Sequence, residues 1–165
     1  MSLPTETERK YLIYIPEETL LSTLPSSGIV QTYLTCEKGA TERVRMRTEN
    51  GVSVYTHTKK VRISPLSSTE DERTITEEEY HALLSRTDTE RKPIHKTRYL
   101  LFENGFTFEI DVFPFWKKQA YMEVELSSEQ EEAPLPKNIT VIREVTGNRA
   151  YSNAALALVI PDEDP

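Results

Sequence analysis

Charged side chains recur at every second position in several stretches of this 165-residue chain. Successive side chains on a β-strand point to opposite faces, so this spacing puts each charged set on one face of a strand. The acidic members are Glu6, Glu8, Glu70, Glu72, Glu109, Asp111, Glu123 and Glu125, and the basic members are Lys10, Arg43, Arg45, Arg47, Lys60, Lys96 and Arg98. Arginine and lysine bind phosphate oxygens, and carboxylates bind Mg²⁺ or Mn²⁺, which bridge readily to phosphates. The two sets together indicate a metal-phosphate site.

An ordinary amphipathic strand with one solvated face would explain any single stretch. The repetition argues against that explanation, because each stretch carries mostly one sign of charge whereas surface strands usually mix signs. A closed barrel of about eight strands has an interior wide enough for side chains and one small ligand. Charges gathered there would form a hydrated binding chamber, since unpaired charges in a dry interior are costly.

The elements that must carry these residues are short stretches with strand-like alternation. There are eight of them, near residues 6–14, 29–36, 42–48, 52–62, 69–75, 95–103, 106–113 and 120–127. Helices are expected over 16–24, 76–84 and 152–158, and the dipeptide at 104–105, Asn-Gly, is a hairpin signal. The sequence therefore predicts an α+β, mainly β fold, in which a closed eight-stranded antiparallel β-barrel with a charged interior and a few covering helices forms one domain over residues 1–165.

Composition narrows the classes of partner. The net charge of -7 and the isoelectric point near 5.1 argue against general nucleic-acid binding. No apolar run approaches the roughly 20 residues that cross a bilayer, and the first residues lack the apolar stretch of a secretory signal, so we expect no membrane partner and a cytoplasmic location. Cys36 is the only cysteine, so any metal must use oxygen or imidazole ligands.

Several short motifs follow one another along the chain in an order that is typical of one protein family. They are TETERKYLI with Glu6, Glu8 and Lys10 in an ExExK arrangement, QTYL at 31–34, ERVRMR at 42–47, YTHTKK at 55–60, EDERTI at 70–75, KTRY at 96–99, FEIDVF at 108–113, YMEVEL at 121–126 and REVTGNRAYSNAALA at 143–157. On these motifs the chain resembles the CYTH superfamily, the triphosphate tunnel metalloenzymes, over nearly its whole length.

The resemblance implies a tunnel of eight antiparallel strands that binds a linear triphosphate or a nucleoside triphosphate together with Mg²⁺ or Mn²⁺. By motif position, the substrate-binding residues would be Lys10, Arg43, Arg45, Lys60, Lys96 and Arg98. The residues that organise the metal would be Glu6, Glu8, Glu72, Asp111, Glu123 and Glu125. In tripolyphosphatases of this family a lysine and a tyrosine are proposed to activate the attacking water, and Lys60 and Tyr33 would fill those catalytic roles here.

Lys60 is preferred to Lys59 because it shares a strand face with Thr58, as in the T-x-K strand of the family. If Arg43 and Arg45 crowd it, the pKa of Lys60 should be depressed, which would suit a base. For Tyr33 a packing role is the alternative. The aromatic residues over 113–116 either pack against a helix or lie at the tunnel mouth or a partner surface.

The function that these observations favour is metal-dependent hydrolysis of a triphosphate, either inorganic tripolyphosphate or an organic one such as thiamine triphosphate. Phosphoryl transfer needs mainly positioning and charge neutralisation, so no nucleophilic residue is required. Two alternatives share the same tunnel: a class IV type adenylyl cyclase that makes cyclic AMP from ATP, and a non-catalytic module that binds polyphosphate or nucleotides. The sequence leaves the oligomeric state open, a homodimer included.

Overall fold

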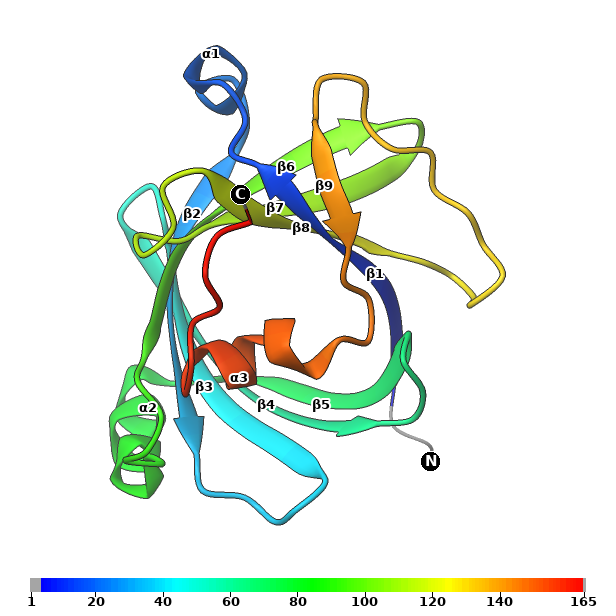
Figure 1. Ribbon diagram of the computed structural model, residues 1–165. Coiled ribbons are helices and arrows are strands. Elements are labelled where there is room, and N and C mark those ends of the chain that lie inside the picture. The colour runs from blue at the N-terminus through cyan, green and yellow to red at the C-terminus, as the bar shows by residue number, and fades with distance from the viewer. Residues whose placement is uncertain (1–3, 165) are drawn as a thin grey trace.

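The computed structural model describes residues 4–164, and its centre is a ring of eight antiparallel β-strands (Figure 1). The strands of the ring are β1 (Thr5–Tyr14), β2 (Ser26–Leu34), β3 (Ala40–Glu49), β4 (Val52–Arg62), β5 (Ser67–Ile75), β6 (Ile94–Glu103), β7 (Phe106–Val112) and β8 (Gln119–Glu125). All eight predicted strands are present within a few residues of their expected bounds. The predicted closed barrel is therefore confirmed.

The strands are hydrogen-bonded in the order β5-β4-β3-β2-β6-β7-β8-β1, and β1 pairs with β5 to close the ring. This closing contact is short, because it joins only Thr5, Glu6 and Thr7 to residues 67–69. Beyond it, β1 pairs along the same edge with a ninth strand, β9 (Val141–Glu144), which the sequence did not predict. One end of this edge of β1 thus pairs with β5 and closes the ring. The other end pairs with β9, which lies outside the ring.

Hairpin turns set the register of neighbouring strands. Asn104 and Gly105 both have positive φ, +53° and +78°, between β6 and β7, as the Asn-Gly signal predicted. Asn50 and Gly51 repeat the arrangement between β3 and β4. A register shift of one residue would turn every charged side chain of a strand to the other face, so these turns fix which residues face inward.

The outer face of the barrel is apolar and is covered in two different ways. Helix α2 (Glu77–Leu83) and the 3-10 turn η1 (Leu84–Arg86) lie over β3 and β4, where Tyr80 packs with Val44. Helix α2 begins at Thr76, whose side chain and that of Glu79 form the predicted capping box. The outer face of β1, β7 and β8 is covered mainly by the irregular segment 126–140, with Leu20 of helix α1 (Glu18–Leu21) beside it. The predicted covering helices are present, and an irregular segment that the sequence did not predict covers the rest of this face.

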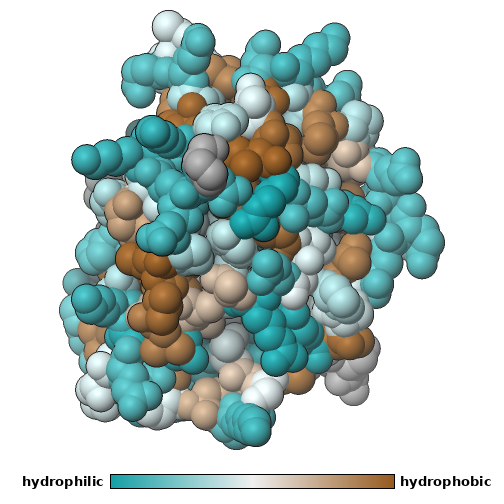
Figure 2. Space-filling view, viewed as in Figure 1, coloured by the Kyte–Doolittle hydropathy of each residue, from teal (hydrophilic) through white to brown (hydrophobic). Residues whose placement is uncertain are grey.

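The C-terminal segment (residues 145–160) lies across the opening of the ring, in orange and red in Figure 1. It contains the 3-10 turn η2 (Arg149–Tyr151) and helix α3 (Asn153–Leu156), the latter within the predicted helix. Hydrophilic side chains cover most of the molecular face in this view, and the hydrophobic ones form separate patches (Figure 2). Among the described residues, no helix combines the length and the apolar character needed to pass through a membrane.

Candidate functional site

The interior of the barrel holds a cavity of about 910 Å³. Ten Lys and Arg residues and seven Glu residues line it, so its wall carries an excess of positive charge although the whole chain has a net charge of -7. Twelve of the thirteen residues predicted for the site line this cavity, and Asp111 is the exception. Alternation along the strands has therefore brought together residues as far apart in sequence as Glu6 and Glu125.

Strand β3 provides a basic wall that lacks acidic partners. Arg43, Arg45 and Arg47 line the cavity, and none of them forms an ion pair with a carboxylate among residues 4–164. Arg45 donates from Nε and Nη2 to Oε1 of Gln31 at 3.2 and 2.8 Å, and Arg47 donates from Nε to the Ser27 hydroxyl at 2.9 Å. The Nε of Arg43 is buried and has no hydrogen-bond partner in the described part of the chain. These guanidinium groups are held in place by neutral side chains and keep their charge available to an anion.

The crowding of these cations lowers the pKa of one of them, Arg45. Burial, and then the neighbouring Arg43 and Arg98, lower the pKa of Arg45 to about 9. A phosphate oxygen placed between these groups would offset the mutual repulsion and raise the pKa of Arg45. The basic wall is therefore complementary to a polyanion.

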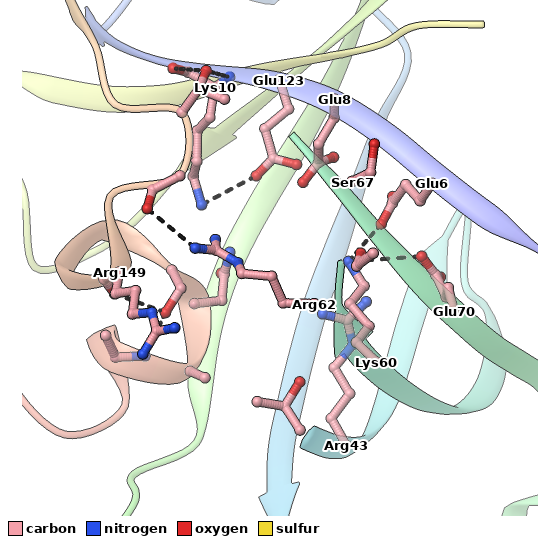
Figure 3. Close-up of a pocket in the computed structure, with 18 of the residues that line it drawn as sticks. Glu6, Glu8, Lys10, Arg43, Lys60, Arg62, Ser67, Glu70, Glu123 and Arg149 are labelled. Carbon is pink, nitrogen blue, oxygen red and sulfur yellow. Dashed lines mark hydrogen bonds and ion pairs between the residues drawn. The ribbon is translucent and has the colours of Figure 1, made fainter. Parts of the chain in front are cut away.

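Strands β1 and β8 provide the opposite, acidic wall (Figure 3). Glu123 forms an ion pair with Lys10 at 3.3 Å, and Lys10 together with a hydrogen bond from Glu8 outweighs the effect of burial, so that the pKa of Glu123 falls to about 2. Glu8 forms no ion pair among the described residues. Burial, followed by the charges of Glu123 and Glu6, raises the pKa of Glu8 well above its ordinary value.

This pair of carboxylates fits a divalent cation. No three His, Cys, Asp or Glu side chains of residues 4–164 converge closely enough to hold a metal. Magnesium, however, is commonly held by only one or two carboxylates and completes its coordination with water and substrate phosphates. The half-buried Glu8 beside Glu123, with an unfavourable charge and no cation of its own, has the character of such a site. Glu6, whose Oε2 is paired with Lys60 Nζ at 2.7 Å, lies on the same wall.

Glu72 and Glu125, the other predicted metal residues on the cavity wall, are both exposed. Glu72 accepts a hydrogen bond from the Thr58 hydroxyl at 2.7 Å. Their position at the wall is consistent with the prediction, but their carboxylates are more solvated than those of Glu8 and Glu123.

Asp111 lies behind the cavity wall rather than on it. Its side chain is 1% exposed and accepts hydrogen bonds from Nε and Nη2 of Arg98 at 2.8 and 2.9 Å, while Lys96 Nζ lies 2.8 Å from Oδ2. Burial alone would raise the pKa of Asp111, but Lys96 and Arg98 hold it well below the usual range. Both oxygens are already bound to cations, so Asp111 holds Lys96 and Arg98 in position behind the cavity wall.

Lys60 is paired with acids and not, as predicted, dominated by arginines. Its Nζ lies 2.7 Å from Glu6 Oε2 and 3.7 Å from Glu70 Oε2. Burial and Arg43 would lower the pKa of Lys60, but the carboxylates of Glu6, Glu8 and Glu70 outweigh them and raise it. The predicted depression of this pKa is wrong, and Lys60 is a charged donor.

Tyr33 is 4% exposed and lines the cavity, where its hydroxyl accepts a hydrogen bond from Gln31 Nε2 at 3.2 Å. Gln31 therefore links Tyr33 to Arg45. Gln31 belongs to the QTYL motif, but it has no charge and belongs to no charged set, so the alternation of charges did not indicate a role for it.

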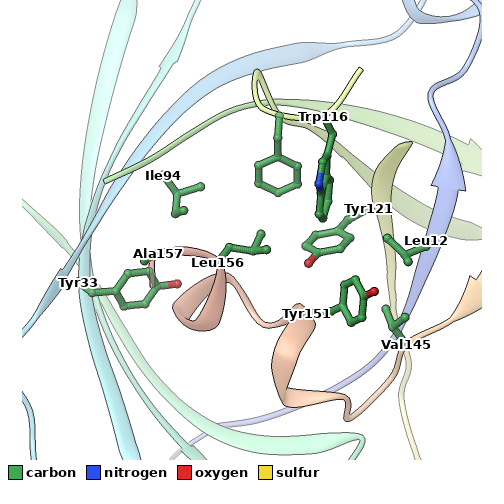
Figure 4. Packing of buried hydrophobic residues seen from close by; sticks show 10 residues of the cluster. Leu12, Tyr33, Ile94, Trp116, Tyr121, Val145, Tyr151, Leu156 and Ala157 are labelled. Carbon is green, nitrogen blue, oxygen red and sulfur yellow. The ribbon is translucent and has the colours of Figure 1, made fainter. Parts of the chain in front are cut away.

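The C-terminal segment adds residues to the cavity wall and is anchored by apolar packing. Tyr151, Leu156 and Ala157 pack against Trp116 and Tyr121 in one buried cluster (Figure 4). The aromatic residues over 113–116 thus have the packing role that was one of the two expectations. The segment also brings Arg149 and Asn153 to the cavity, and Asn153 Oδ1 accepts a hydrogen bond from Lys96 Nζ at 3.1 Å.

Arg62 of β4 also lines the cavity. Neither it nor Arg149 was predicted as a site residue. The even spacing of Thr58, Lys60 and Arg62 could have indicated Arg62.

Glu70 gives the protein a pH-dependent stability. Burial, and then a hydrogen bond shared with Glu6, raise the pKa of Glu70 to about 7, whereas in the unfolded chain it is near 4.5. Glu70 thus favours the folded state fully below the unfolded value, and this contribution is lost as the pH rises through 7. In metal-free thermal melts we expect Glu70→Gln to melt above the parent at about pH 8 and together with it near pH 4. An equal difference at both pH values would contradict this assignment.

Known proteins similar to this chain were found among solved structures; no family model and no curated protein sequence matches it. The inorganic triphosphatase NE1496 is 31% identical, with a TM-score of 0.58, and the match covers 98% of this chain and 100% of that one. A Hippeastrum protein provisionally assigned as an adenylyl cyclase, with a dominant triphosphatase activity, is 15% identical with a TM-score of 0.50 over 73% of this chain and 80% of that one. A provisionally assigned adenylate cyclase from Vibrio parahaemolyticus is 10% identical with a TM-score of 0.53 over 74% of this chain and 78% of that one. At 15% and 10% identity, the last two proteins show only that their fold is shared with this chain.

Proposed function

Because the chain belongs to the CYTH superfamily, the triphosphate tunnel metalloenzymes, we propose that it hydrolyses inorganic tripolyphosphate inside its barrel with the help of Mg²⁺ or Mn²⁺. The observation that carries this proposal is the basic wall of β3, whose Arg43, Arg45 and Arg47 have no carboxylate partner among the described residues. Leaving several arginines unpaired in a protein with an acid excess is unfavourable unless an anion binds them. The similarity to the triphosphatase NE1496 supports the same choice.

The residues of the two walls would act on different parts of the substrate. Arg43 and Arg45 would bind the phosphate oxygens, and Lys96 and Arg98, held by Asp111, would add charged donors from β6. Glu8 and Glu123 would hold the divalent cation, with Glu6, Glu72 and Glu125 on the same cavity wall. The cation would neutralise phosphate charge and polarise the bond that breaks. The substrate would lie between the basic and the acidic wall.

Hydrolysis in this arrangement needs no nucleophilic side chain. The transition state of phosphoryl transfer is loose, so that positioning and charge neutralisation supply most of the catalysis. Tyr33 and Lys60 remain our candidates for orienting the attacking water. Because Lys60 is charged, it would do so as a hydrogen-bond donor and not as a base.

The shape and chemistry of the wall favour an inorganic substrate. Tyr33 is the only aromatic residue that lines the cavity within residues 4–164, and it is 4% exposed. Recognition of a purine or a thiazolium ring commonly uses stacking on aromatic side chains, of which this wall offers only the buried Tyr33.

The test is a panel of tripolyphosphate, thiamine triphosphate and ATP, each incubated with Mg²⁺ and with Mn²⁺ and read for free phosphate and for cyclic AMP. We expect phosphate release to be fastest from tripolyphosphate. Cyclic AMP as the main product would replace the proposal with a cyclase. Tight binding of tripolyphosphate without release of phosphate would make the protein a polyphosphate-binding module.

Arg45→Ala is expected to act mainly on substrate binding. The variant loses a two-donor guanidinium that contacts the substrate both before and during the reaction, so KM should rise while kcat changes little. A charged hydrogen bond contributes about 1.5–3 kcal/mol, which corresponds to a rise of roughly ten- to a hundredfold in KM. Steady-state kinetics measure this effect, and an unchanged KM with a strongly reduced kcat would show that Arg45 acts only in the transition state.

A further inference from the structure

Two arginines of the cavity wall have no place in the proposed hydrolysis. Arg62 ends β4, and Arg149 begins the 3-10 turn η2 of the C-terminal segment. Both line the cavity and both are exposed, and neither forms an ion pair with a carboxylate of residues 4–164. Figure 3 shows both side chains in the same cavity as the ion-paired Lys10 and Lys60.

These arginines are brought together by the packing of two loops. Arg62 donates from Nη1 to the carbonyl oxygen of Gly147 at 3.1 Å, two residues before Arg149. Gly147 has φ +73°, and a Cβ at this position would lie 2.7 Å from the Cβ of Pro65, so the loop packs closely against the β4–β5 connection. The other side chains of residues 146–153 that line the cavity are uncharged. Residues 146–153 therefore add positive charge and no carboxylate to this end of the cavity.

The strand register places Arg62 beyond the basic wall of β3. Arg45 is paired with Thr56 and Arg43 with Thr58, and Lys60 pairs with Thr41. Arg62 therefore lies four residues beyond the partner of Arg43, about 13 Å farther along the strand. From the level of Arg45 to Arg62 the row of cations covers six residues of β4, or roughly 20 Å.

A triphosphate is too short to occupy the whole row. Four P–O bonds separate its terminal phosphorus atoms, and each is about half the rise of one strand residue, so the fully extended triphosphate spans about two residues of strand. A triphosphate bound by Arg43 and Arg45 would leave Arg62 and Arg149 free. A longer linear chain of phosphates would continue toward them.

We propose that Arg62 and Arg149 form an outer anion subsite that binds the additional phosphates of linear inorganic polyphosphates longer than three units. This inference rests on the proposed function, because it requires the inner phosphates to be held by the basic wall of β3. The outer subsite extends the substrate class from tripolyphosphate to longer chains. It is a binding subsite and takes no part in breaking the bond.

The test measures equilibrium binding, without divalent metal, of linear polyphosphates of three, four and six units by titration calorimetry. The proteins compared are the parent, Arg62→Ala, Arg149→Ala and, as a control of equal charge change, Arg73→Ala. Arg73 projects from β5 outside the cavity, where its Nε lies 3.4 Å from His57 Nδ1. We expect each outer-subsite variant to weaken hexaphosphate binding about tenfold and triphosphate binding about twofold or less, since a charged hydrogen bond is lost only with the longer chain.

Losses of the same size for all three chain lengths would overturn the outer subsite and leave only a general electrostatic attraction. An Arg73→Ala variant that loses as much hexaphosphate affinity as Arg62→Ala would overturn it as well. Failure of the parent to bind even tripolyphosphate would overturn the assignment of the inner phosphates to the basic wall of β3, and with it the inference, whereas the proposed hydrolysis fails only if the substrate panel with Mg²⁺ and Mn²⁺ releases no phosphate. Parent binding of tripolyphosphate with no gain for longer chains would overturn the inference alone.

Discussion

Glu8→Gln is expected to lose at least about a hundredfold in turnover of tripolyphosphate while the metal-free protein becomes no less stable. Glu8 is a half-buried carboxylate next to Glu123 and Glu6, and desolvation together with these neighbours raises its pKa. Glutamine keeps the size of the side chain but removes the charge that would hold a divalent cation. The same change removes repulsion from the metal-free site, so the melting temperature near pH 8 should equal or exceed that of the parent.

Glu123→Gln is the matched comparison. Glu123 is the ion-pair partner of Lys10, so its replacement should lower activity and also destabilise the protein by leaving Lys10 unpaired. Activity measured against Mg²⁺ and Mn²⁺ concentration, together with melting curves of the metal-free variants, separates the two effects. Full activity of Glu8→Gln would show that Glu8 holds no metal, and a large fall in its melting temperature would show that its charge is structural.

Asp111→Asn is expected to destabilise the protein by about 3–5 kcal/mol, the largest stability effect of any conservative substitution at the site. Asp111 compensates two buried cations, Lys96 and Arg98, whose side chains are 1% and 9% exposed. Asparagine fills the same space but leaves Lys96 without a counter-charge and Arg98 with only the more exposed Glu109. Urea unfolding of the metal-free variant, compared with the parent, measures the change.

Glu109→Gln provides the control, because Glu109 also pairs with Arg98, at 2.8 Å, but its side chain is 35% exposed. Ion pairs that reach solvent contribute about 1 kcal/mol or less. A smaller loss for Asp111→Asn than for Glu109→Gln would show that Asp111 does not compensate these cations in the way its contacts suggest.

The fold was predictable because one signal was repeated in most of the strands. Alternation of charged and apolar residues in β1, β3, β7 and β8 defined an inner and an outer face, and eight such strands close into a barrel. Strand β9 was missed because it has only four residues. The irregular cover over 126–140 was missed because its apolar residues follow neither the strand nor the helix period.

The residues that line the site could be predicted from the sequence, but the ion pairs between them could not. Alternation states which face a side chain occupies, not how deep it lies, so Asp111 was expected at the cavity surface and is instead enclosed by Lys96 and Arg98. The protonation of Lys60 depends on Glu70 of the neighbouring strand and on Glu6 beyond it, across the closing contact of the ring. Both residues are distant from Lys60 in the sequence and come close to it only through the pairing of strands. The sequence therefore could not show which charges would balance it.

The contact that closes the ring also determines where the barrel is weakest. Only three residue pairs join β1 to β5, whereas β3 and β4 share ten. The hydroxyls of Thr7 and Ser67, 2.9 Å apart, and the packing of Gly147 against Pro65 supplement this short ladder. Cooperative units with few backbone hydrogen bonds open at a lower free energy than the rest of a protein. Local unfolding at this seam would thus open the ring sideways along its length while the pairings of the other strands persist.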